Sequence, residues 1–134
     1  MGSYILKPVH MLFGYPLETV FLFCLILLFL IAGMSHFVLP KVFLNIMPPW
    51  TEPRKKELNI LVGIAELAVG VGLILAETRT PAGIGAILIL IAVFPAHVYM
   101  LQNPKVNYGL PEWLLWARLP IQGILIGLVI WTAL

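Results

Sequence analysis

Charged residues are scarce in this chain: Asp, Glu, Lys and Arg make up only 10% of its 134 residues, whereas a soluble domain averages about a quarter. Hydrophobic residues make up 61%, and the mean hydropathy is +1.03. A soluble globule of this length could not bury so much apolar side chain, because small proteins keep a large share of their surface exposed. The scarcity of charge therefore excludes an ordinary soluble domain and predicts that lipid solvates much of the surface.

Cysteine is nearly absent as well. The single Cys24 excludes an internal disulfide and a CxxC redox pair, and with them the thiol chemistry of disulfide-forming membrane enzymes. Because Cys24 lies within an apolar run, it is predicted to be a small buried apolar residue. The net charge is only +2, which gives no indication of a nucleic-acid partner.

Long hydrophobic runs are what the chain has in abundance. Each is roughly 20 residues long, enough at 1.5 Å per residue to cross a hydrocarbon core of about 30 Å. Such segments must be helical, because lipid offers no partner to backbone polar groups. The predicted fold is all-α: one transmembrane domain over 1–134, an integral membrane up-down four-helix bundle preceded by a short interfacial N-terminal segment. The predicted helices cover 18–39, 58–76, 81–101 and 113–134.

Proline marks the connections between these runs. Within the first connection, Pro48, Pro49 and Trp50 predict a short rigid, extended segment with Trp50 as an interfacial aromatic anchor. Thr80 is the predicted N-cap of the third helix, and Pro81 is predicted to lie in its first turn.

Small residues predict where helices pack closely. In the second run, Asn59, Gly63, Glu66 and Gly70 follow one another at helical spacing and so share one face. The fourth run carries the GxxxG pair at 123–127, a common motif that leaves a homodimer open as one possibility.

Basic residues predict the orientation. Most lie in the first and third connections or just inside the fourth run, and only Lys7 and Arg79 lie on the other side. The positive-inside rule then places both termini on the non-cytoplasmic side. The predicted location is the bacterial inner membrane. The residues on the basic side are Lys41, Arg54, Lys55, Lys56, Lys105 and Arg118.

The polar residues within the runs cluster at one depth. His36, Glu66, His97, Arg118 and Gln122 all fall in the same half of the bilayer if the helices alternate in direction. An unpaired charge in hydrocarbon costs several kcal/mol, so these groups are expected to face inward and to find partners. Arg118 lies about one helical turn from Glu66 in depth, which predicts that these two side chains pair.

This cluster has two interpretations. It is either a buried ion pair that fixes helix register, or the lining of a pocket for a polar or amphipathic ligand. Pro95 and Pro120 lie at the same depth and would free the carbonyls of Ile91 and Trp116. Two histidines and a carboxylate can ligate a metal, but Arg118 would repel a cation, so no metal site is predicted.

Five short motifs occur in order between Gly33 and Trp131: GMSHF at 33–37, GIAELAVGVGLIL at 63–75, TRTPAG at 78–83, FPAHVYM at 94–100 and WARLPIQ at 116–122. Together they resemble the DoxX-like family of small four-helix membrane proteins. In this resemblance the family's polar positions fall on His36, Glu66, Arg118 and Gln122. Many members have Asn after the FPA motif, where this chain has His97.

The resemblance implies a membrane accessory role, since the family is named after a subunit associated with thiosulfate:quinone oxidation. The expected function is an accessory or small-ligand-binding subunit of a membrane complex, without catalytic activity of its own. A quinone-linked oxidoreductase component is the first alternative, and transport of a small solute or a proton is the second. A quinone or lipid-like ligand would suit both the accessory subunit and the oxidoreductase component. The expected partners are the bilayer and other membrane subunits or a second copy, with no nucleic acid.

Overall fold

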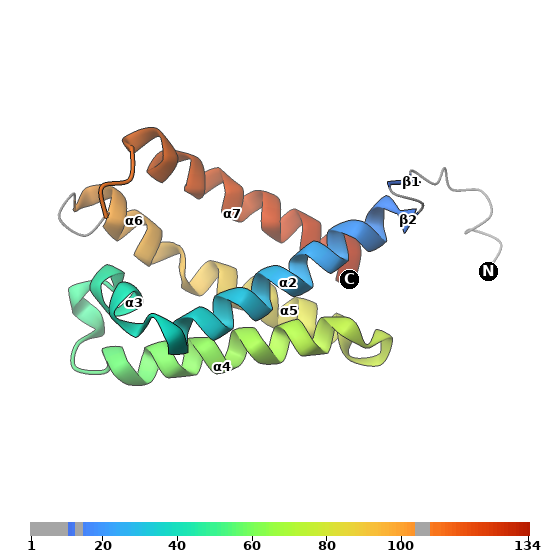
Figure 1. The fold of residues 1–134 in the computed structure, drawn as a ribbon, viewed down its shortest axis with the longest axis horizontal. Coiled ribbons are helices and arrows are strands. Elements are labelled where there is room, and N and C mark those ends of the chain that lie inside the picture. Colours follow the sequence, from blue (N-terminus) through green and yellow to red (C-terminus); the bar gives the residue numbers. More distant parts are fainter. Residues whose placement is uncertain (1–10, 13–14, 104–107) are drawn as a thin grey trace.

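The computed structural model describes residues 11–12, 15–103 and 108–134, and almost all of them are helical (Figure 1). Most of the predicted interfacial N-terminal segment, Lys7 and Lys105 lie outside the described residues. A two-residue antiparallel pairing of β1 (Met11–Leu12) with β2 (Tyr15–Pro16) precedes the helices. The helical elements are α2 (Leu17–Val38), α3 (Pro40–Ile46), the 3-10 helix η1 (Pro49–Thr51), α4 (Lys55–Ile74), α5 (Ala76–Ala92), α6 (Phe94–Gln102) and α7 (Glu112–Ala133).

Four helical segments are long and apolar enough to cross a membrane, which confirms the predicted number of long apolar helices. Their surfaces are apolar on the outside as well as the inside. Each segment has at least one large aliphatic residue that is more than half exposed, for example Ile31 at 65%, Leu61 at 62%, Leu88 at 62% and Ile124 at 61%. Soluble proteins rarely expose apolar side chains over so much of their surface. The segments are Leu17–Val38, Lys55–Ile74, Ala76–Gln102 and Glu112–Ala133.

The long helices pack around a shared core. Helix α2 packs on α4 and α7, and α5 packs on the same two helices. Consecutive long helices run back and forth through the molecule (Figure 1). The core is built from the first half of α2, the second halves of α4 and α7, and α5. It therefore lies toward the end of the molecule that holds the α4–α5 turn, and the polar residues occupy the opposite end. Its most buried members are Leu25, Phe29, Leu73, Ala86 and Val129.

Glycine permits the close approach of α2 and α4. A Cβ on Gly63 would lie 2.9 Å from the Cβ of His36, and one on Gly33 would lie 2.9 Å from the carbonyl oxygen of Gly63. The four small and polar residues predicted to share a face of α4 are all buried, which confirms that prediction. Apart from the nearby backbone of α7 itself, no described atom lies within 4 Å of a Cβ built on Gly123 or Gly127, so the GxxxG pair faces away from the other described helices.

The predicted extended segment of the first connection is confirmed at Pro48 and wrong at Pro49 and Trp50. Pro48 has φ −58° and ψ 148°, whereas Pro49 begins the 3-10 helix η1, and Pro40 occupies the first position of α3. Proline fixes φ near −65°, which suits the first turn of a helix as well as an extended chain. The sequence signal was therefore ambiguous, and the packing of α3 on α2, α4 and α6 decides in favour of the helix.

The third long helix begins at Ala76 rather than at Pro81, so Thr80 is not its N-cap. Only Leu75 separates α4 from α5. Side chains of α5 bond the last carbonyls of α4 across this turn: Thr78 Oγ1 donates to Gly72 O at 2.7 Å, and Arg79 Nε donates to Leu73 O at 3.0 Å. These bonds satisfy acceptors that a helix end leaves open, and they allow a turn too tight to predict from composition.

A polar cavity at one end of the helices

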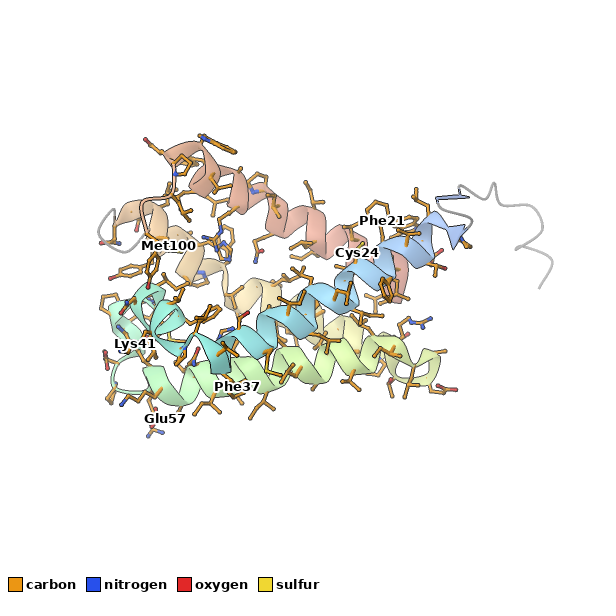
Figure 2. The ribbon with its side chains drawn as sticks, in the orientation of Figure 1. Phe21, Cys24, Phe37, Lys41, Glu57 and Met100 are labelled. Carbon is orange, nitrogen blue, oxygen red and sulfur yellow. The ribbon has the colours of Figure 1, made fainter. Side chains whose placement is uncertain are left out.

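A cavity of about 310 Å³ lies at the end of the molecule away from the apolar core. Figure 2 labels Lys41 and Glu57 at this end, and Phe21 and Cys24 toward the other. Helices α2, α4, α6 and α7 contribute to its lining, and the α3–η1 connection closes one side. Most of the lining is apolar, including Phe43, Ile46, Met47, Leu58 and Val62. The polar side chains in the lining are His36, Thr51, Glu66, His97 and Arg118.

His36 is held at this position from two directions. The Asn59 side chain of α4 donates from Nδ2 to the His36 carbonyl at 2.9 Å, and its Oδ1 lies 2.7 Å from His36 Nδ1. The imidazole also stacks on Phe43 of α3, with ring centroids 3.8 Å apart. His36 and Asn59 are both buried. The close approach at Gly63 brings α2 near enough to α4 for this clamp to form.

The other ring nitrogen of His36 faces Glu66. His36 Nε2 and Glu66 Oε2 lie 3.2 Å apart, and both side chains are almost fully buried. The distance is that of an ion pair. Apart from this contact, the buried Glu66 Oε2 has no hydrogen-bond partner among the described residues. Glu66 also belongs to the lining of the cavity.

Arg118 does not pair with Glu66, so that prediction is wrong. The Arg118 side chain donates from Nη1 to the Met100 sulfur at 3.3 Å, and no carboxylate lies within 4.0 Å of it in the described part of the chain. Depth along a helix axis does not fix the direction in which a side chain points. Glu66 on α4 faces α2, the helix that packs most closely on it, whereas Arg118 on α7 faces α6.

His97 lies on α6 and lines the same cavity. Its Nδ1 is buried and has no hydrogen-bond partner within the residues that the structure describes. A buried polar atom without a partner is rare in proteins and calls for an explanation, such as a ligand or water that satisfies it. His97 is thus the second lining residue that has a buried atom without a hydrogen-bond partner in the described structure.

Gln122 is buried but is absent from the cavity lining. It donates from Nε2 to the Leu90 carbonyl at 3.0 Å and so joins α7 to the end of α5.

The two prolines at this depth have different effects on their helices. The third long helix breaks at Val93, just before Pro95, whereas α7 continues through Pro120. The break frees the last carbonyls of α5, and the one that accepts a side-chain donor is Leu90 rather than Ile91.

Asn59 is the site residue that sequence reasoning missed. It was assigned to the packing face of the second helix, seven residues before Glu66. That spacing is two helical turns, so it could have indicated that Asn59 belongs with the polar cluster. The lining residues of α3 and η1 gave no such signal, because no helix was predicted in the first connection. Among them, Thr51 is buried and donates from Oγ1 to Pro48 O at 2.6 Å.

The polar lining does not assemble a metal site in the described residues. Across 11–12, 15–103 and 108–134, no three His, Cys, Asp or Glu side chains gather as metal ligands would. What the lining offers instead is one guanidinium, one carboxyl and two imidazoles around an apolar space.

Comparison with known proteins identifies the family of this chain. Residues 25–133 match the family model described as a domain of unknown function, DUF8561, and the chain belongs to that family. No curated protein and no solved structure matches it.

Proposed function

We propose that this member of the DUF8561 family is an integral membrane protein that acts as an accessory or small-ligand-binding subunit of a membrane complex. In this proposal the four long helices cross the bilayer as an up-down bundle. Their length supports it, and so do the large aliphatic side chains exposed on every one of them. The hydrocarbon of the bilayer is the solvent in which such a surface is stable.

The cavity is the observation that carries the ligand-binding role. Its volume of about 310 Å³ is at the lower end of the range of small-molecule sites, and its apolar walls surround a few polar groups, as such sites do. A ligand with an apolar body and a compact polar end fits this lining. The polar end would lie against Glu66, His97 and Arg118.

Arg118 indicates the chemistry of that polar end. A guanidinium offers five N–H donors, and the only described side chain that accepts from it is a thioether, which is a weak acceptor. A carbonyl, carboxylate or phosphate oxygen would be a much better partner in a low-dielectric site. We therefore infer that the ligand presents such an oxygen to Arg118.

The subunit role rests on how little of the chain lies outside the long helices. The connections are short and partly helical, and they offer little surface for a separate catalytic domain. The resemblance to DoxX-like accessory proteins agrees with this role. Other membrane subunits or a second copy of the chain are the proposed partners. The positive-inside rule supports a bacterial inner-membrane protein with both termini outside the cytoplasm.

Ligand binding can be tested by native mass spectrometry of the protein extracted in mild detergent. We expect the wild type to retain a small amphiphile. The amount retained by Arg118→Gln should be at least about ten-fold lower, because one charge-assisted hydrogen bond contributes roughly 1.5 to 3 kcal/mol to binding. Lys41→Gln is the matched control, since it removes an exposed cation at the same end of the molecule. Equal retention by both variants would contradict the proposal.

A quinone-linked oxidoreductase component is the second candidate. The specific observation in its favour is that groups able to exchange protons, His36 and Glu66, line the same cavity as Arg118, which could polarise a quinone carbonyl. The electrons would come from a partner protein. Quinone in the wild-type extract that is absent from the Arg118→Gln extract would favour this candidate over a lipid-binding subunit.

A further inference from the structure

We propose that His36 and Glu66 form a proton-binding pair in the cavity lining, and that Asn59 is the positioning residue that fixes where the shared proton lies. The inference depends on the geometry of three side chains. It therefore stands or falls separately from the binding of an amphiphile at Arg118.

The orientation of Asn59 is set by the backbone. A carbonyl oxygen can only accept a hydrogen bond, so the atom that meets His36 O at 2.9 Å must be the amide nitrogen of Asn59. The other terminal atom, 2.7 Å from His36 Nδ1, is then the amide oxygen, which also can only accept. His36 Nδ1 must therefore carry a hydrogen. The two contacts with Asn59 are therefore enough to show that a neutral His36 is the Nδ1–H tautomer.

The opposite nitrogen then has one of two states. With the hydrogen on Nδ1, a neutral His36 presents a bare lone pair from Nε2 toward Glu66 Oε2, 3.2 Å away. A carboxylate oxygen in the same place would set two lone pairs against each other in a buried site. The contact is favourable only when one proton is present, either on Nε2 as an imidazolium beside a carboxylate, or on Oε2 as a carboxylic acid beside an imidazole.

The surroundings leave this proton available to the cavity. Phe43 of α3 covers one face of the imidazole and contributes no charge. The other titratable or charged groups that line the cavity are His97 of α6 and Arg118 of α7. Neither is within ion-pair distance of Glu66 in the described structure, and Glu66 Oε2 has no hydrogen-bond partner there besides its contact with His36. Both His36 and Glu66 line the cavity, so a ligand oxygen that reached the pair could take the proton and leave a neutral imidazole beside a carboxylate, and the reverse transfer would restore the pair.

The test combines two spectroscopic measurements on the full-length protein in lipid. Selective ¹⁵N-histidine labelling and solid-state NMR report which ring nitrogens of His36 carry a proton, and a His97→Gln sample assists the assignment. Infrared spectroscopy reports whether the Glu66 carboxyl is protonated. At neutral pH we expect Nδ1 to be protonated, and we expect one proton in total on Nε2 and Glu66. An unprotonated Nδ1, or no proton on either Nε2 or Glu66, would overturn the proposal from the wild-type spectra alone.

Glu66→Gln is the decisive variant because it preserves size and can donate an amide N–H to the bare Nε2. In this variant we expect His36 to remain the neutral Nδ1–H tautomer. Its Nε2 should stay unprotonated throughout the pH range in which the Nε2 or Glu66 signal of the wild type changes. The same pH-dependent Nε2 signal in wild type and Glu66→Gln would show that the two groups do not share a proton. In the Glu66→Gln background, where His36 is expected to be neutral, adding Asn59→Leu should yield a mixture of both neutral tautomers. An unchanged Nδ1–H tautomer in that double variant would show that Asn59 does not position the proton.

Discussion

The buried polar residues in and beside the cavity differ in how completely their hydrogen bonds are made. Asn59 uses its amide nitrogen and its amide oxygen on one neighbour, and Gln122 satisfies a freed carbonyl. Glu66 and His97 each retain a buried atom without a hydrogen-bond partner among the described residues. A purely structural network would be expected to satisfy all its members, because unsatisfied buried groups destabilise the fold. Both residues belong to the lining of the cavity, so the incomplete hydrogen bonding gathers at the proposed ligand site.

The pairing of Glu66 with His36 can be measured by a double-mutant cycle. We expect Glu66→Leu and His36→Leu each to lower the free energy of unfolding in detergent by about 3 to 5 kcal/mol, because each leaves a buried partner alone. The double variant should lose less than the sum, with a coupling energy of about 0.5 to 3 kcal/mol.

The same cycle with Arg118→Leu in place of His36→Leu provides the comparison. Because Arg118 bonds the Met100 sulfur rather than Glu66, its coupling to Glu66 should be smaller than that of His36. A stronger coupling of Glu66 with Arg118 than with His36 would show that the carboxyl faces α7 instead of α2.

At the scale of the helix, two sets of glycines in the same chain have different roles. Gly33, Gly63 and Gly70 lie where α2 and α4 cross, and an added Cβ at each would come within 3.0 Å of the opposite helix. Gly123 and Gly127 lie on α7, and an added Cβ there would meet no described atom beyond the nearby backbone of α7 itself. Sequence spacing suggested a packing role for Gly63 and Gly70 and for the GxxxG pair, and of these only Gly63 and Gly70 pack on another described helix.

Alanine substitution should separate these two sets. We expect Gly63→Ala to destabilise the protein by about 1 to 3 kcal/mol, because its Cβ would overlap His36 and Phe37 across the α2–α4 contact. Gly123→Ala should leave the stability of the monomer unchanged or raise it slightly, since alanine favours a helix over glycine. Unfolding in detergent, followed by circular dichroism, measures both. Equal losses from the two variants would contradict the close approach at Gly63.

At the scale of the whole molecule, apolar residues point outward as well as inward. Cys24 illustrates this, because it was predicted to be buried and is exposed on α2. The prediction failed because an apolar run in a lipid-solvated helix does not distinguish the core face from the lipid face. In the proposed membrane arrangement Cys24 faces hydrocarbon, about 10 Å along the helix from Leu17.

Thiol labelling tests this arrangement and the proposed orientation together. We expect native Cys24 to react with a lipid-soluble maleimide but not with a membrane-impermeant one. In a Cys24→Ala background, Glu77→Cys in the α4–α5 turn should react with the impermeant reagent added outside intact cells. Glu52→Cys in the first connection should react only after the membrane is permeabilised. Rapid labelling of Cys24 by the impermeant reagent would mean that α2 is not embedded, and reversed access of the two introduced cysteines would invert the orientation.

The sequence by itself determined the number and approximate place of the long helices, because a run of apolar residues in lipid has no alternative to internal backbone hydrogen bonding. It also indicated that His36, Glu66, His97 and Arg118 belong at one end of the molecule, because helical rise converts residue number into height. Gln122 lies nearby but bonds a backbone carbonyl outside the cavity lining.

Only the tertiary structure decided which side chains meet. Height does not give direction around a helix axis, so the partner of Glu66 depended on which helix packs most closely on α4, and the glycines at the crossing make that helix α2. The α3–η1 connection depended on packing too, since proline fits both the first turn of a helix and an extended chain. The clamp of Asn59 on His36, and the cavity beside it, arise from these contacts between distant segments, which no local pattern in the chain encodes.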